Sequence, residues 1–141
     1  MSSVPPDAST IAERHRSKHR EATADVEFGA WIDGERRTEG PTRGIEDPVT
    51  GQSIVDVPQC DAGDVDDAVD AAGEAFEGGW GDATVRDRSK RLFEWADVLA
   101  DHVEALTLLE CLDCGKPISQ ARGEVEGAID TLEFYASAVR T

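Results

Sequence analysis

The chain has 141 residues, 39 % of them hydrophobic, and a formal net charge of −16 at pH 7. This length is sufficient for one domain with its own hydrophobic core. The strong negative charge argues against a nucleic-acid partner, because phosphate binding needs a basic surface. No apolar run approaches the roughly 18 residues of a membrane span. The N-terminus also lacks the hydrophobic segment of a secretion signal.

The charge composition indicates a protein adapted to high salt. Sixteen aspartates and eleven arginines accompany only three lysines. Repulsion among the acidic groups is screened in molar salt, where the Debye length falls to about 3 Å. The three cysteines imply no disulfide framework. We therefore predict a halophilic protein of a reducing cytoplasm, and the alternative is an ordinary acidic protein.

Residues 1–24 are predicted to form a disordered polar tail, separate from residues 25–141. The tail holds four basic and three acidic residues, whereas the other 117 residues hold 10 bases and 27 acids. No apolar periodicity accompanies the mixed run from Arg14 to Arg20, which favours a solvated arm. The same run is also suited to binding an anion or another chain.

Short β-hairpins are predicted after the tail. Residues 28–33 alternate between apolar and other side chains, and Asp33-Gly34 is a hairpin-turn dipeptide. A second extended piece is expected near residues 36–38. Pro48 and Gly51 mark another turn before a short strand over residues 53–57. Two-stranded hairpins of this kind are not stable without further packing.

Four helices are predicted to follow the hairpins. Asp61 and Thr84 are suited to capping the first two, while Gly115 and Pro117 end the third. Their apolar side chains recur at helical spacing: Val65, Ala68, Val69, Ala72 and Phe76; Leu92, Trp95, Ala96 and Leu99; Ala105, Leu108, Leu109 and Leu112; Ile118, Ala121, Val125, Ala128, Ile129, Leu132 and Tyr135. Trp31, Trp80 and Trp95 are interpreted as packing residues. The predicted strands are few and short, so they offer little surface for these helices to pack against. Some apolar helix faces should therefore stay exposed to solvent.

Cys111 and Cys114 form a C-x-x-C motif whose chemistry the context does not favour. A redox pair needs its first cysteine at a helix N-terminus, where the helix dipole lowers the thiol pKa. Here both cysteines lie near the end of a predicted helix. A zinc site needs four ligands, and Cys60, His15, His19 and His102 lack the usual spacing. We interpret the motif as incidental, with a small redox protein as a further hypothesis.

Nucleotide-binding loops are absent from the sequence. Gly115-Lys116 does not belong to a P-loop, because Glu110 stands where glycine is required and Pro117 replaces serine or threonine. No Gly-x-Gly-x-x-Gly motif is present either. The sequence therefore identifies no cofactor-binding residue.

Several runs together resemble the aldehyde dehydrogenase family. Residues 110–117 (ECLDCGKP) and 47–51 (DPVTG) are similar to motifs near the start of those enzymes. Residues 61–76 resemble the first long helix of the family, residues 86–99 the second, and residues 134–136 an aromatic pair after the fourth. The resemblance covers about residues 28–141, in the family's order and spacing. It implies an α/β fold of which this chain is an N-terminal fragment, with β-hairpins followed by about four helices.

The resemblance also implies one ion site. Many family members hold a structural monovalent cation, and the matching ligands here are the carboxylate of Asp113 and the backbone carbonyls of Ile45 and Glu46. A hard cation prefers such oxygen ligands. The alternative is that Asp113 is a solvated residue at a helix end. No catalytic residue carries over, because the family's Gly-Gln-x-Cys and Glu-Leu-Gly-Gly-Lys motifs and its Gly-x-Thr-x-x-Gly turn are all absent.

The resulting hypothesis is an N-terminal fragment of an NAD(P)-dependent aldehyde dehydrogenase, truncated before the nucleotide-binding and catalytic regions. Its parent reaction would convert an aldehyde to a carboxylic acid, with NAD or NADP as cofactor. We expect the chain alone to be inactive and to bind no cofactor. The alternative is a binding module that complements a separate C-terminal dehydrogenase chain or a full-length homologue.

Overall fold

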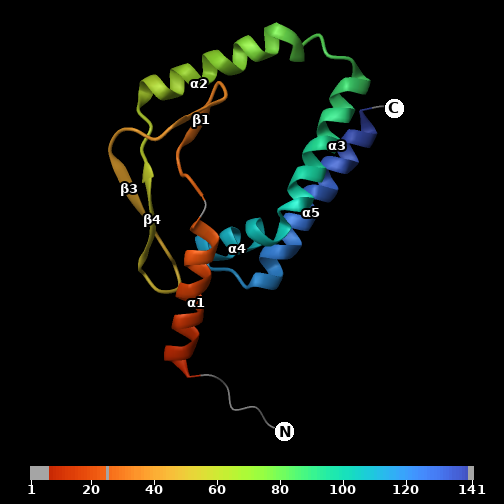
Figure 1. Ribbon diagram of the computed structural model, residues 1–141. Coiled ribbons are helices and arrows are strands. Elements are labelled where there is room, and N and C mark those ends of the chain that lie inside the picture. The colour runs from red at the N-terminus through yellow and green to blue at the C-terminus, as the bar shows by residue number, and fades with distance from the viewer. Residues whose placement is uncertain (1–6, 25, 140–141) are drawn as a thin grey trace.

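The computed structural model describes residues 7–24 and 26–139. Helix α1 (Ala8–Thr23) comes first, and two antiparallel strand pairs follow it. Helix α2 and a short π-helical segment η1 then lead to α3, α4 and α5. Figure 1 shows α3 and α5 side by side, with α2 extending away from them above the strands. The predicted order of hairpins followed by four helices is confirmed.

The first strand pair is the predicted hairpin. Strands β1 (Ala30–Ile32) and β2 (Glu35–Arg37) pair so that Ile32 lies opposite Glu35. Asp33 and Gly34 have φ values of 48° and 76°. Positive φ at both central residues is the requirement of a type I′ turn, whose twist matches that of the flanking strands.

The second pair joins β3 (Thr42–Glu46) to β4 (Ser53–Pro58). The sequence predicted most of β4 but not β3, because residues 42–46 show no regular alternation of apolar side chains. The register shifts between Ile45 and Glu46. Such an irregularity bends a strand and disrupts its ladder locally.

Helix α2 (Ala62–Ala75) is capped at its start and touches the first hairpin only lightly, through contacts with β1 and an ion pair between Asp67 and Arg37. The Asp61 side chain accepts hydrogen bonds from the backbone N–H groups of Gly63 and Asp64, and the Asp64 carboxylate accepts one from the Asp61 N–H. This is the predicted capping box. None of the α2 residues is buried. The chain continues into η1 (Phe76–Trp80), which is also unburied.

The last three helices begin and end close to where the sequence placed them. They are α3 (Val85–Asp101), α4 (Val103–Cys114) and α5 (Ile118–Ala138). Thr84 caps α3 by accepting a hydrogen bond from the Asp87 N–H. Gly115 ends α4 in the left-handed conformation, at φ 68°. The predicted terminator is therefore confirmed.

The core lies where α5 packs against α3 and α4, and most of its buried side chains are small. The fully or almost fully buried residues of these three helices are Ser89, Ala96, Thr107, Leu112, Ala121 and Ala136. Small side chains let helices approach closely, but they bury little apolar area. The large side chains that the sequence placed on the apolar faces are mostly outside this core.

The prediction of solvent-exposed apolar faces is confirmed, and the packing role given to the tryptophans is wrong for the described part of the chain. Trp31, Trp80 and Trp95 are 65 %, 45 % and 57 % exposed. Arg36 lies 5.3 Å from the ring centre of Trp31, and Arg88 lies 5.7 Å from that of Trp80. No other layer of the described structure covers these rings. The physical reason is that two hairpins cannot cover four amphipathic helices.

The N-terminal segment differs from the expected disordered arm. Residues 1–6 lie outside the described residues, but residues 8–23 form α1. Asp7 caps the helix by accepting a hydrogen bond from the Thr10 N–H at 2.9 Å. The remaining support comes from distant parts of the chain, because α1 contacts α4 and the turn between β3 and β4. Local periodicity does not reveal contacts of this kind. Among the helices described here, none is long and apolar enough to cross a membrane.

Candidate functional site

The two runs that carried most of the family resemblance meet in space. Gly115, at the end of α4, lies against Pro48 and Val49 in the turn between β3 and β4. A β-carbon at position 115 would come within 2.8 Å of Pro48 Cγ and 3.6 Å of Val49 Cγ2. Only glycine therefore suits this position, both for its positive φ and for this close approach.

Asp47 organises the turn, and it is almost completely buried. Its Oδ1 accepts a hydrogen bond from the Val49 N–H at 2.9 Å, and its Oδ2 accepts one from the Thr50 hydroxyl at 2.5 Å. The Gly51 N–H donates to the Asp47 carbonyl at 2.7 Å. A carboxylate that bonds its own backbone two residues on is a recurring way to fix a turn.

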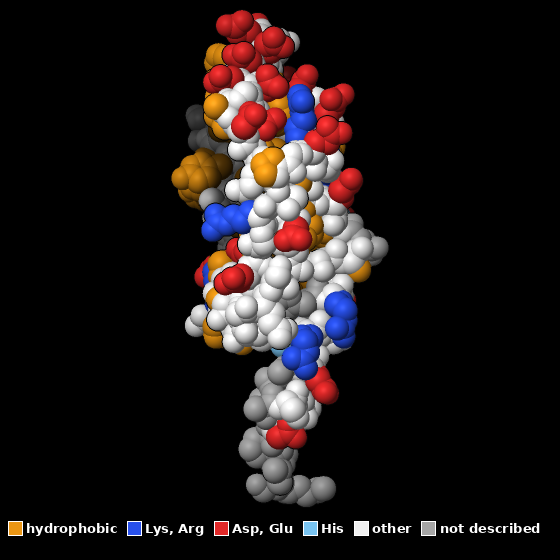
Figure 2. Space-filling model, turned by 90° about the vertical axis from the view of Figure 1, so that its left-hand side faces the viewer, with side chains coloured by type: hydrophobic (Ala, Val, Ile, Leu, Met, Phe, Trp, Pro, Cys, Tyr) orange, Lys and Arg blue, Asp and Glu red, His pale blue; other side chains and the backbone are white. Residues whose placement is uncertain are grey.

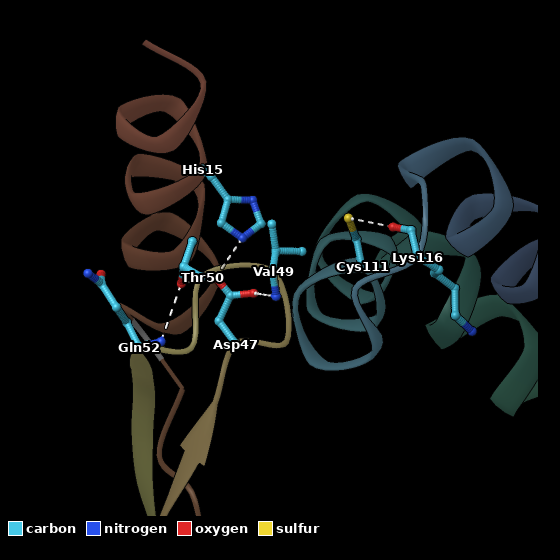
Figure 3. A network of polar contacts seen from close by, with 7 residues as sticks. All are labelled: His15, Asp47, Val49, Thr50, Gln52, Cys111 and Lys116. Carbon is cyan, nitrogen blue, oxygen red and sulfur yellow. Dashed lines mark hydrogen bonds and ion pairs between the residues drawn. The ribbon is translucent and has the colours of Figure 1, made fainter. Parts of the chain in front are cut away.

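His15 of α1 completes the surroundings of this carboxylate. Its Nε2 lies 2.8 Å from Asp47 Oδ2, and Figure 3 shows the imidazole above the turn. Burial alone would raise the pKa of Asp47, but the hydrogen bonds from Thr50 and Val49 and the neighbouring His15 together lower it. Asp47 is therefore a charged group that joins α1 to the turn. The sequence does not predict this partner, because nothing local links positions 15 and 47.

Lys116, just beyond Gly115, joins α4 to α5. Its Nζ pairs with Glu110 of α4 and, at 2.6 Å, with Glu124 of α5. These two carboxylates raise the pKa of Lys116. The lysine thus joins the two helices across the loop between them.

The cysteines of the C-x-x-C motif lie near the C-terminal end of α4, as the sequence predicts. The Cys111 thiol donates to the Lys116 carbonyl at 3.1 Å (Figure 3). Cys114 is exposed, and its pKa is raised by desolvation and by the nearby Glu110 carboxylate. Since thiolates are the reactive form, a raised pKa disfavours nucleophilic or redox chemistry there. Cys60 lies elsewhere, exposed beside α2.

Two of the three predicted cation ligands lie around one cavity. Ile45 and Asp113 both line a mainly apolar cavity of about 440 Å³ between the β3–β4 pair and α4, and Glu46 does not. The register shift falls between Ile45 and Glu46, where the ladder is disturbed. In the described part of the chain, no three His, Cys, Asp or Glu side chains are grouped to hold a metal ion. The predicted site uses one carboxylate and two backbone carbonyls, so the absence of such grouped side chains does not test it. The ion site stays a prediction.

Comparison with known proteins agrees with this arrangement of motifs. The model of the aldehyde dehydrogenase family matches residues 31–141, well over half of the chain. The chain belongs to the aldehyde dehydrogenase family. The family resemblance that the motifs implied is therefore confirmed.

Curated relatives of the chain are aldehyde dehydrogenases of several kinds. A mitochondrial succinate-semialdehyde dehydrogenase from Arabidopsis thaliana is 34 % identical over 134 residues, which is 95 % of this chain and 25 % of the relative. An aminoacetaldehyde dehydrogenase from Pseudomonas aeruginosa is 37 % identical over 84 % of this chain and 25 % of the relative. The chain thus spans about a quarter of the length of the relatives it matches.

Solved structures of the family superpose well on the described fold. Betaine aldehyde dehydrogenase from Staphylococcus aureus, in complex with NAD⁺, matches with a TM-score of 0.82 and 29 % identity over 88 % of this chain and 25 % of that one. A γ-glutamyl-γ-aminobutyraldehyde dehydrogenase from Burkholderia cenocepacia gives 0.80 and 35 %, over 89 % and 26 %. The fold class predicted from the sequence is confirmed by these structures.

Proposed function

We propose that this chain serves as the N-terminal part of an NAD(P)⁺-dependent aldehyde dehydrogenase that oxidises an aldehyde to a carboxylic acid. The observation that carries the proposal is the contact between Gly115 and Pro48, because it joins the two runs on which the family resemblance rests. The superposition on an NAD⁺-bound betaine aldehyde dehydrogenase supports the same assignment.

The residues of this chain fit a supporting role in that reaction. The cofactor would accept hydride from the substrate in the complete enzyme. No dinucleotide-binding turn and no nucleophile loop occur in the printed sequence. Asp47, His15 and Lys116 instead fix the turn and the helix ends on one another. We therefore propose that residues 1–141 by themselves neither bind NAD(P)⁺ nor oxidise aldehydes.

A chimera tests the family role directly. Residues 31–141 would replace the matched segment of betaine aldehyde dehydrogenase, and NADH formation would be followed at 340 nm with betaine aldehyde. We expect measurable turnover by the chimera and none by the isolated chain in molar KCl. A folded chimera without activity would contradict the supporting role, and NADH production by the isolated chain would contradict the predicted inactivity.

The alternative function is complementation of a separate dehydrogenase chain, and the exposed apolar side chains favour it. They lie on β1, α2, η1, α3 and α5, and isolated soluble proteins rarely leave so many uncovered. The large hydrophobic residues that are more than half exposed include Trp31, Val65, Val69, Phe76, Trp95, Phe134 and Tyr135.

Co-purification tests this alternative. The chain would be mixed with a family enzyme from which the matched segment has been removed, and complex formation would be measured by size-exclusion chromatography with light scattering. V65D/V69D should weaken the complex at least tenfold, because it places charges on the apolar face of α2. D66N on the same helix is the matched control and should leave it intact. A monodisperse chain that forms no complex would exclude complementation.

A further inference from the structure

We propose that the pocket between α1 and the β3–β4 turn binds a small phosphate- or sulfate-type oxyanion. The pocket has a volume of about 190 Å³, and its lining includes Arg16 and Arg20 of α1 together with Asp47, Thr50, Gln52 and Ser53 of the turn. This pocket adjoins the cavity beside Asp113, with Thr23 and Ile54 lining both, and the proposal does not depend on the dehydrogenase role.

The two arginines face the pocket from successive turns of one helix. Positions 16 and 20 are four residues apart, so their side chains lie on the same side of α1. Neither arginine forms an ion pair with any other residue that the structure describes, whereas Arg122 of α5 pairs with Glu104 and Glu126. The chain has a net charge of −16. Two arginines on neighbouring helical turns that form no ion pair therefore concentrate positive charge at one place.

Acidic side chains outnumber basic ones in this chain, by 30 to 14. On the face drawn in Figure 2, Asp and Glu side chains crowd the upper end, and fewer Lys and Arg side chains are scattered from the upper part to the lower part. The long-range field of the molecule therefore repels anions in general, and only a site that supplies its own positive charge and hydrogen bonds can hold one. Guanidinium groups supply both, since their planar fork matches the oxygens of phosphate and sulfate.

Asp47 does not cancel this positive charge. Its carboxylate already accepts hydrogen bonds from the Val49 N–H and the Thr50 hydroxyl, and His15 lies 2.8 Å from Oδ2. The pocket is thus lined by two positively charged guanidinium groups and one carboxylate, and this carboxylate already has hydrogen-bond partners. The hydroxyl of Ser53 and the amide of Gln52 add neutral donors on the opposite wall.

The size of the pocket limits the ligand. A volume of 190 Å³ is several times the roughly 30 Å³ that a water molecule occupies in the liquid. It accommodates one tetrahedral oxyanion with a few waters, and a larger organic group attached to the oxyanion would extend into solvent. A bound anion would bridge α1 to the turn, so it would stabilise the docked helix by mass action.

Isothermal titration of the full chain with inorganic phosphate, at fixed ionic strength in KCl, tests the proposal. We expect saturable binding that R16Q/R20Q weakens at least tenfold. R14Q/R43Q removes the same charge from arginines outside the pocket, and it should change the affinity less than twofold. R16K/R20K keeps the positive charge but removes the planar guanidinium groups, and it should bind phosphate several-fold more weakly. Circular dichroism should show that α1 remains folded in this variant.

Two results would overturn the proposal: no saturable binding of phosphate or sulfate, or equal losses in R16Q/R20Q and R14Q/R43Q. A parallel titration with a nucleoside monophosphate separates the sources of the ligand. Tighter binding of the monoester would identify a phosphorylated metabolite as the ligand, and equal affinity would identify free phosphate.

Discussion

Gly115 lies so close to Pro48 that no side chain fits between them. A β-carbon at position 115 would approach Pro48 Cγ to 2.8 Å. The contact joins the end of α4 to the turn between β3 and β4, two segments more than sixty residues apart in the sequence. This junction also brings the neighbouring Asp47 and Lys116 to opposite sides of one small region of the fold (Figure 3).

Gly115→Ala should destabilise the chain. The left-handed conformation at φ 68° costs a residue with a β-carbon about 1 to 2 kcal/mol, and the overlap with Pro48 adds to that cost. Urea unfolding in molar KCl measures the loss. Gly127→Ala in α5 is the matched control, because no atom beyond the adjacent residues and backbone of its own helix lies within 4 Å of the added β-carbon. It should stabilise the helix by roughly 0.5 to 1 kcal/mol, and equal effects of the two substitutions would contradict the junction.

Asp47→Asn should reduce the dependence of the unfolding free energy on pH in the acid range. The pKa of Asp47 is lowered in the folded state, below the value of about 3.9 in the unfolded chain. The carboxylate therefore contributes stability above that pH, and the contribution is lost as the pH falls through the folded pKa. At neutral pH the lost hydrogen bonding should cost about 1 to 3 kcal/mol.

Unfolding free energies measured from about pH 7 down to about pH 2 check this prediction, because the contribution is lost below the unfolded pKa. Asp56→Asn, at an exposed position of β4, is the control, and its unfolding free energy should depend on pH as that of the wild-type chain does. The role assigned to Asp47 would be wrong if both variants followed the same pH profile.

Asp61→Ala should loosen α2 without unfolding the rest of the chain. The capping box holds the first turn, and loss of an N-cap costs about 0.5 to 2 kcal/mol. Because no α2 residue is buried, local opening does not require the core to open. Hydrogen exchange should become faster in α2 and stay unchanged in α5. Asp66→Ala serves as control, and uniform acceleration throughout the chain would show that α2 is part of the cooperative core.

Stability should rise steeply with salt. The net charge of −16 destabilises a compact state at low ionic strength, and the Debye length falls from about 10 Å at 0.1 M to about 3 Å at 1 M. Thermal unfolding across this range of KCl measures the effect. D66N/D70N should weaken the salt dependence and Arg86→Gln should strengthen it. A melting temperature independent of KCl would contradict the predicted adaptation to high salt.

Much of the local structure followed from the sequence, because its causes are local. Asp33-Gly34 specified a hairpin turn, Asp61 and Thr84 specified helix starts, and Gly115 specified a helix end. Each signal depends on the conformational preference of one residue or on a hydrogen bond over three positions. The ordered motifs also identified the family, which the comparisons confirm.

Only the tertiary structure decided what these elements do together. It brought His15 of an expected disordered arm to Asp47, paired β3 with β4, and left Trp31 and Trp95 exposed. It also turned Arg16 and Arg20 toward one pocket. These outcomes depend on contacts between segments far apart in the chain, and no local preference encodes such contacts. Sequence alone thus determined the elements and the family, while packing determined the pairings and the exposed surfaces.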